Sequence, residues 1–164
     1  MTKIQGRAWV FGDNIDTDLI VPSKYLTEQD PVVMAQGTFE NTRPEFAHEV
    51  REGDIIVAGG NFGCGSSREE AVFVLKTLGI LAIVARTFAR IFFRNAINLG
   101  LPALEVGLAP GDVEDGAQVE VDVAEGTLTN LDTGATFQFA KLPTFLQDIL
   151  DAGGALNWVQ NRGT

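Results

Sequence analysis

The chain has 164 residues, a length that predicts one domain over residues 1–164 with a hydrophobic core of its own. Its formal net charge of −10 argues against nucleic acid or an anionic membrane as a partner, because such binding depends on lysine and arginine. A single cysteine excludes a disulfide framework and fits a reducing compartment. With no long apolar run and no signal peptide in the sequence, we expect a cytoplasmic protein.

The chain begins with a predicted strand that leads into a polar connection. Residues 7–11 have strand character, and residues 12–14 (Gly-Asp-Asn) are typical of a turn. Asp16, Thr17 and Asp18 follow. Short polar residues in a connection usually bond their own backbone, which is the simplest interpretation of these three.

The next segment carries no pattern of catalytic residues. Residues 24–31 are polar, contain a proline and lack periodicity, which predicts a mobile surface loop. Residues 32–47 predict short helical pieces broken by Gly37 and Pro44. His48 is the only histidine, and it lacks partners at metal-ligand spacing. We therefore expect it at the surface or at a helix cap.

The most distinctive segment is a glycine-dense turn at residues 59–70. It lies between a short apolar run at 54–58, typical of a buried strand, and residues 71–78, whose apolar positions have helical spacing. The glycines leave backbone N–H groups uncovered, and the start of a helix adds unpaired donors and a partial positive charge. Such a corner attracts anions.

Two interpretations of the polar residues in this turn remain open. Ser66 with Glu69, or Ser67 with Glu70, has the spacing of a capping box, which needs no ligand. Capping does not explain Arg68, because a cation at a helix start opposes the helix dipole unless an anion is nearby. The turn also lacks the lysine of a phosphate loop and the third glycine of a dinucleotide fingerprint. These features favour a pocket for a carboxylate or a phosphate.

A strand at 80–85 is predicted next, parallel to the strand at 54–58, and an amphipathic helix follows it. Arg86, Arg90 and Arg94 lie four residues apart along this helix. They could pair with nearby carboxylates, cap backbone carbonyls, dock a partner or support Arg68. Arg86 could also bind the 2′-phosphate of NADP. From residue 119 the alternation of polar and apolar residues predicts an antiparallel meander, and a closing helix pair follows.

Three segments together resemble the small subunits of 3-isopropylmalate dehydratase. They are residues 12–22 (GDNIDTDLIVP), 63–69 (GCGSSRE) and 88–101 (FARIFFRNAINLGL). The same pattern marks homoaconitase small subunits and the swivelling fourth domain of aconitase, whereas the last third of the chain matches only in general character. The resemblance implies an α/β fold of the three-layer β/β/α swivelling type, with a mixed sheet and an antiparallel portion.

The resemblance also implies a hydro-lyase site. Members of the family move a hydroxyl between adjacent carbons of a small dicarboxylic or tricarboxylic acid, by removing water and adding it back. It puts Ser66 at the position of the base, Ser67 beside it, and Arg68 at the residue that binds a substrate carboxylate.

Three further residues are implied as substrate-binding. Thr17 and Asp18 match positions close to the active site, where Asp18 would orient a hydroxyl or an arginine. The loop after Tyr25 would face the variable end of the substrate, and Thr27 stands there in place of an arginine that many members carry. This departure leaves the preferred acid open.

The family's cofactor is a 4Fe–4S cluster held by three cysteines, whereas this chain has only Cys64. Cys64 stands where aconitase has a residue that is not a ligand, so we expect a small buried side chain. The resemblance therefore implies that this chain binds no metal and no cofactor itself. It implies an enzyme subunit that is active only with a separate large subunit carrying the cluster.

Three functions are compatible with the sequence. The first is the small subunit of 3-isopropylmalate dehydratase in leucine biosynthesis. The second is a homoaconitase small subunit in lysine biosynthesis, which would differ mainly near Thr27. The third is a stand-alone nucleotide-binding or adaptor domain whose glycine turn holds phosphate.

Overall fold

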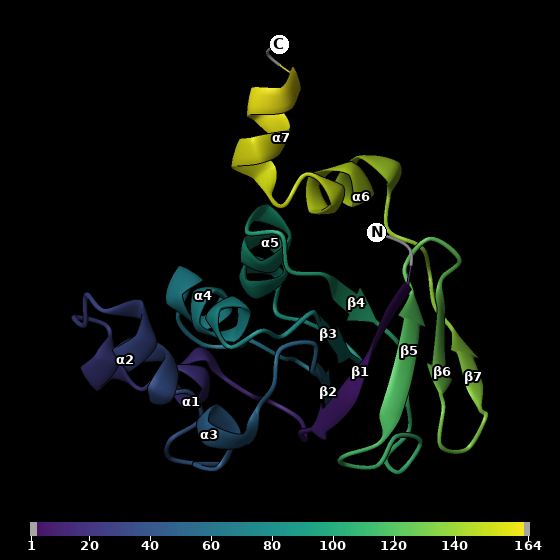
Figure 1. The fold of residues 1–164 in the computed structure, drawn as a ribbon, viewed down its shortest axis with the longest axis horizontal. Coiled ribbons are helices and arrows are strands. Elements are labelled where there is room, and N and C mark those ends of the chain that lie inside the picture. The colour runs from purple at the N-terminus through teal and green to yellow at the C-terminus, as the bar shows by residue number, and fades with distance from the viewer. Residues whose placement is uncertain (1–2, 163–164) are drawn as a thin grey trace.

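A mixed sheet of seven strands forms the centre of the computed structural model, which describes residues 3–162 (Figure 1). The strand order is β4-β3-β2-β1-β5-β6-β7. The parallel half consists of β1 (Lys3–Val10), β2 (Ile55–Ala58), β3 (Ala82–Ala85) and β4 (Ala103–Glu105). The antiparallel half begins where β1 pairs with the next strand, and consists of β5 (Gln118–Asp122), β6 (Thr127–Asn130) and β7 (Thr136–Gln138).

Five helices lie beside the parallel half of the sheet (Figure 1): α1 (Thr17–Ile20), α2 (Pro31–Gln36), α3 (Phe46–Glu49), α4 (Glu69–Thr77) and α5 (Arg90–Asn98). At the other end of the chain, α6 (Thr144–Asp151) packs on α5, and α7 (Ala155–Arg162) extends away from the body. No helix within residues 3–162 has the length and the apolar character needed to cross a membrane.

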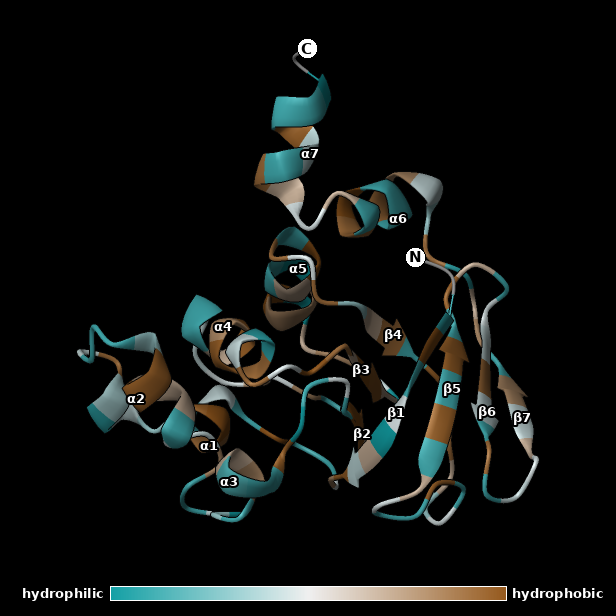
Figure 2. Ribbon diagram, in the orientation of Figure 1, coloured by the Kyte–Doolittle hydropathy of each residue, from teal (hydrophilic) through white to brown (hydrophobic). Residues whose placement is uncertain are grey.

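Strands β2 and β3 are buried on both faces, and a separate core packs against each face. On β2, Ile56 and Ala58 pack in a core with the helices, whereas Ile55 and Val57 pack in a core with strand β5. Side chains alternate across a strand, so neighbouring residues divide between the two cores. Figure 2 shows the result as apolar colour along β2 and β3 and alternating colour along β5. The predicted three layers, helical, parallel and antiparallel, are confirmed.

Most predicted elements are confirmed, including the strand, turn and helix at residues 54–78, the meander and the closing helix pair. The short elements β4 and α1 were not predicted from the sequence. The predicted loop at 24–31 is not irregular throughout, since a 3-10 helix spans Ser23–Tyr25 at its start. The Tyr25 hydroxyl donates to Glu40 at 2.7 Å, which anchors this segment to the chain beyond α2.

The helix that was expected to carry Arg86, Arg90 and Arg94 is shorter than predicted. Helix α5 begins at Arg90, so Arg86 lies in the connection that precedes it. The prediction failed because four-residue spacing alone does not show where a helix begins. The three arginines therefore do not form one stripe along a helix.

Candidate functional site

The three motifs of the sequence meet side by side, held by backbone hydrogen bonds. The glycine-dense turn lies in the middle, with the segment before α1 on one side and the segment before α5 on the other. The bonds run from Asn14 N to Gly60 O (2.8 Å), from Gly63 N to Ile15 O (2.7 Å), from Thr17 N to Cys64 O (2.9 Å) and from Ala89 N to Phe62 O (2.9 Å). Segments far apart in the sequence thus form one rigid corner around Ser66.

Phe62 and Gly63 fix the turn against helix α5. The fully buried Phe62 ring makes edge contacts with Phe92 (centroids 5.2 Å apart) and Phe88 (6.1 Å). Such aromatic pairs each contribute about 0.5–1.5 kcal/mol beyond the area they bury. Gly63 has a φ of +83°, and a Cβ at this position would lie 2.1 Å from Cγ of Phe92. Only glycine lets the turn approach the helix this closely.

A hollow of about 300 Å³ opens beside Ser66, and we call it the Ser66 hollow. Its lining comes from the turn and from the starts of three helices: Thr17, Gly63, Gly65, Ser66, Ser67, Arg68, Ala89, Arg90, Ile91 and Phe92. Ser66 and Ser67 are exposed, so a ligand in the hollow can reach the serine side chains. The volume is at the lower end of ligand pockets, which span about 300–1,000 Å³.

The starts of α4 and α5 both border the Ser66 hollow. The N-cap residues are Arg68 for α4 and Ala89 for α5, and no side chain caps either helix. The capping-box interpretation of Ser66 and Ser67 is therefore wrong. Both serines precede the N-cap Arg68, one or two residues too early for the box. Uncapped helix starts carry free N–H groups and partial positive charge, so the hollow favours an anion.

Arg68 is held by a residue of another motif. Its guanidinium forms an ion pair with Asp18 and donates to the backbone oxygen of Val21 at 3.2 Å. The expectation that Asp18 contacts an arginine is confirmed. The Arg68 side chain is 16% exposed, and its guanidinium has five N–H donors, so it can hold a carboxylate in addition to Asp18.

Of the three polar residues before and within α1, only Asp16 bonds its local backbone. Its carboxylate accepts from Leu19 N at 2.8 Å and so caps α1. The buried Thr17 instead donates its hydroxyl to the backbone oxygen of Ser66 at 2.7 Å. Thr17 therefore fixes the backbone at Ser66, and the simplest interpretation from the sequence holds for Asp16 alone.

Asp18, Thr27 and Cys64, all named from the sequence, lie outside the lining of the Ser66 hollow. Thr27 is exposed in a turn before α2, so its role toward the substrate stays a prediction. Cys64 is half-buried, less than expected, because it lies in the turn between β2 and α4 and not in either hydrophobic core. Burial, together with the negative charge of Asp16, raises the pKa of the Cys64 thiol. His48 is exposed, as predicted.

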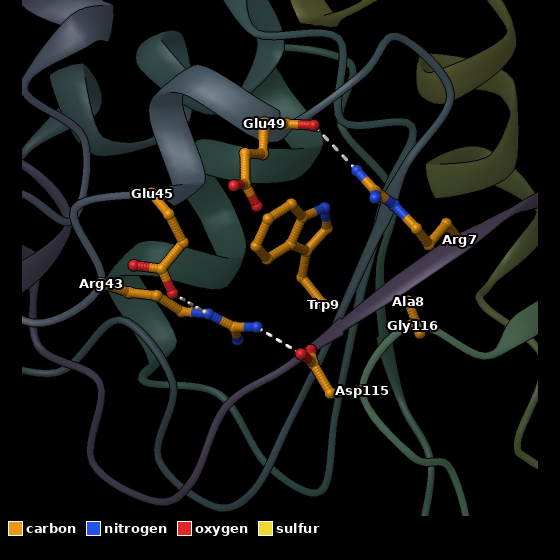
Figure 3. Close-up of a pocket in the computed structure, with 8 residues that line it drawn as sticks. All are labelled: Arg7, Ala8, Trp9, Arg43, Glu45, Glu49, Asp115 and Gly116. Atoms are coloured by element: carbon orange, nitrogen blue, oxygen red, sulfur yellow. Dashed lines mark hydrogen bonds and ion pairs between the residues drawn. The ribbon is translucent and has the colours of Figure 1, made fainter.

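A second hollow, of about 210 Å³, surrounds Trp9 (Figure 3). The guanidinium carbons of Arg7 and Arg43 lie 4.9 and 4.7 Å from the centre of the Trp9 ring. Both arginines are paired with carboxylates, Arg7 with Asp54 and Arg43 with Asp115. Because its cations are already neutralised, we interpret this cluster as a structural link between β1 and the three connecting segments that carry Arg43, Asp54 and Asp115.

Arg86 is also paired, which bears on the nucleotide alternative. Its guanidinium contacts Asp13 at 2.9 Å, and Asp13 in turn accepts from Gly60 N at 2.7 Å. Pairing with a carboxylate was one of the roles considered for this arginine. The ion pair with Asp13 already neutralises the positive charge of Arg86 that would otherwise bind the 2′-phosphate of NADP.

Comparison with known proteins connects the site to a family. The family model of the aconitase C-terminal domain matches residues 14–107, a range that includes the Ser66 turn and the start of α5. A 3-isopropylmalate dehydratase small subunit of Methanopyrus kandleri is 54% identical over 160 residues, which cover 98% of this chain and 94% of that protein. The chain belongs to the family of 3-isopropylmalate dehydratase small subunits.

Other members of the 3-isopropylmalate dehydratase small-subunit family agree in sequence and in fold. The small subunit of Aquifex aeolicus is 50% identical over 161 residues, covering 98% of this chain and 96% of that protein. A crystal structure of 3-isopropylmalate dehydratase from Methanocaldococcus jannaschii is 42% identical, with a TM-score of 0.92 over 98% of this chain and 95% of that one. The fold that the resemblance implied is therefore confirmed.

The cofactor of the family does not fit the residues of this chain. A 4Fe–4S cluster takes cysteine thiolates, and Cys64 is the only cysteine in the sequence. Among the described residues, no three His, Cys, Asp or Glu side chains come together as a possible metal site. A cluster therefore needs ligands from another subunit.

Proposed function

We propose that this chain supplies the proton-transfer and carboxylate-binding half of the active site of 3-isopropylmalate dehydratase. The enzyme interconverts 2-isopropylmalate and 3-isopropylmalate by dehydration and rehydration, in leucine biosynthesis in the cytoplasm. The observation that carries the proposal is the exposed Ser66 in a hollow bordered by two uncapped helix starts and Arg68. The names of the relatives support the choice of reaction.

Ser66 is the proposed base. Its oxygen takes the proton from the carbon next to a substrate carboxylate, the electron pair of that C–H bond forms a C=C bond, and hydroxide leaves from the neighbouring carbon. Adding water back in the opposite orientation gives the isomer. A serine alkoxide is costly at neutral pH, and free N–H groups and cations lower this cost. The two uncapped helix starts and Arg68, which border the Ser66 hollow, are of this kind.

Substrate positioning falls to the residues around Ser66. Arg68 binds one carboxylate of the acid, and Ser67 lies next to it. Asp18 holds the Arg68 guanidinium through an ion pair, and Thr17 fixes the Ser66 backbone. Thr27, in the turn before α2, is the proposed contact for the variable end of the substrate.

The proposed partner is the large subunit of the dehydratase. It would provide the cysteine ligands of the cluster, which this chain lacks. The substrate would then lie between the two subunits, with the Ser66 hollow on one side. Nucleic acid and membrane play no part in the proposal, in agreement with the net charge of −10.

The test is reconstitution with the large subunit of the same organism. We expect isomerisation of isopropylmalate by the mixture, and a loss of kcat of about 10²–10⁴-fold in Ser66→Ala, the range for a lost general base. Affinity between the subunits should not change. Thr133→Ala removes a hydroxyl from the exposed β6–β7 turn and serves as the control.

Two results would contradict the proposal. The first is a Ser66→Ala enzyme whose kcat stays close to that of the wild type, which would remove the base. The second is a wild-type mixture that turns over homoaconitate and not isopropylmalate, which would move the chain to lysine biosynthesis. Tight binding of ATP or NADP by the isolated chain would favour the nucleotide alternative instead.

A further inference from the structure

Arg90 is a cation in the Ser66 hollow to which the proposed function gives no role. It is the first residue of α5, its side chain is exposed, and it lines the hollow. Within residues 3–162, the structure gives its guanidinium no ion pair and no hydrogen bond. Arg68 and Arg86, by contrast, are each paired with an aspartate. Arg90 thus supplies the unpaired positive charge of the hollow.

The position of Arg90 is unfavourable for a cation unless an anion binds beside it. Helix α5 has no acidic residue in its first turn and no capping side chain. A positive charge at a helix start opposes the helix dipole. The chain carries 22 aspartate and glutamate residues against 12 lysine and arginine residues, yet none of these carboxylates pairs with Arg90 in the part that the structure describes. A bound anion would satisfy both the guanidinium and the helix start.

The substrate of the proposed reaction carries two carboxylates, and Arg68 accounts for one of them. We propose that Arg90 binds the second carboxylate, from the wall of the Ser66 hollow that α5 provides. This inference rests on the proposed function. The guanidinium fork matches the two oxygens of a carboxylate, and a hollow of about 300 Å³ suits a small diacid. Arg90 binds and orients the substrate and takes no part in proton transfer.

The test uses the complex with the large subunit and two variants of Arg90. In Arg90→Gln we expect the KM for isopropylmalate to rise about 10- to 100-fold, the loss that corresponds to one charge-assisted contact. The kcat should change less than about threefold, because the contact is made in the ground state and the transition state alike. Arg90→Lys keeps the charge without the fork, so its KM should be intermediate.

Arg94→Gln is the matched control. Arg94 is exposed on the same helix, one turn further along, and does not line the hollow. Its removal changes the net charge by the same amount, so we expect a wild-type KM. Because Arg90 and Arg94 are both exposed, each variant should also keep the wild-type circular dichroism spectrum, and neither should lower Tm. In Arg90→Gln the loss of a cation that opposes the helix dipole should leave Tm equal to or slightly above that of the wild type.

A second measurement separates substrate binding from a contact with the partner. We expect the wild-type complex to be inhibited more strongly by a saturated dicarboxylate than by the monocarboxylate of the same chain length, and Arg90→Gln to lose most of this preference. Affinity for the large subunit, measured in parallel, should not change.

Three outcomes would overturn the assignment of Arg90. They are an unchanged KM in Arg90→Gln, an equal rise in KM in Arg94→Gln, or an intact preference for the dicarboxylate together with weaker binding of the large subunit. The last result would make Arg90 a contact for a protein carboxylate. If Arg90→Gln does not fold, Arg90→Lys is the test. A wild-type KM and an intact preference for the dicarboxylate in that variant would overturn the assignment. An inactive wild-type complex would instead contradict the proposed function itself.

Discussion

Replacing Gly63 by alanine should destabilise the protein strongly, although only one methyl group is added. The backbone at Gly63 has a φ of +83°, and this left-handed conformation costs an alanine about 1–2 kcal/mol. The new Cβ would lie 2.1 Å from Cγ and 2.4 Å from Cβ of Phe92. These atoms are at the root of the side chain, so relief requires a shift of α5 itself. Overpacking of this kind costs a further ~1–3 kcal/mol.

The two contributions sum to about 2–5 kcal/mol for Gly63→Ala. In a chain of this size each kcal/mol lowers Tm by about 2–4 °C, so we expect a Tm roughly 4–20 °C lower. Thermal and urea unfolding, followed by circular dichroism, measure the change. The activity of the reconstituted enzyme should also fall, because the turn carries Ser66.

Gly134→Ala is a control that separates the cost of backbone strain from the cost of the clash with Phe92. Gly134, in the β6–β7 turn, has a φ of +81°, but a Cβ there would have no atom within 4 Å. We expect only the backbone cost of about 1–2 kcal/mol at this position. A loss at Gly63→Ala no larger than that at Gly134→Ala would refute the reasoning about Phe92.

Two further predictions concern side chains outside the Ser66 hollow. Asp54 is 7% exposed and accepts hydrogen bonds from Trp9 Nε1 (2.8 Å) and Arg7 Nη2 (2.9 Å), so Asp54→Ala should cost about 3–5 kcal/mol in urea unfolding. Asp54→Asn, which keeps an acceptor, should cost less, and equal losses would argue against the hydrogen bonds as the cause. Burial, and after it the charge of Asp16, raises the pKa of the Cys64 thiol. The rate of its alkylation by iodoacetamide should therefore keep rising with pH beyond about 8.5, the pKa of a free thiol. The urea-unfolded chain is the reference, and a folded-state midpoint below that of the unfolded chain would contradict this prediction.

Local pattern was sufficient to predict the elements that are long or strongly periodic. The apolar run at 54–58 and the helical spacing at 71–78 predicted β2 and α4 to within two residues. The four residues of α1 and the three of β4 are too short to show a period. Their structure depends on an aspartate cap in α1 and on pairing with β3 in β4, and neither is visible in local spacing.

Residue types and the resemblance together also predicted that Ser66, Ser67 and Arg68 share one turn, and all three line the Ser66 hollow. Their roles toward a substrate stay predictions. The capping box failed because S-x-x-E spacing does not specify which residue is the N-cap. The spacing of the arginines likewise did not show where the helix begins. Arg86 lies before α5, and Arg90 is the first residue of the helix.

The sequence by itself determined the strand-turn-helix corner and its membership of a family, because glycine content, hydrophobic period and motif order are properties of neighbouring residues. Only the tertiary structure decided which charges remain free. Asp18 neutralises Arg68, Asp13 neutralises Arg86, and Arg90 is left unpaired within the described residues. The physical reason is that an ion pair depends on the distance between side chains in space, and these partners come from segments that only the folded sheet brings together.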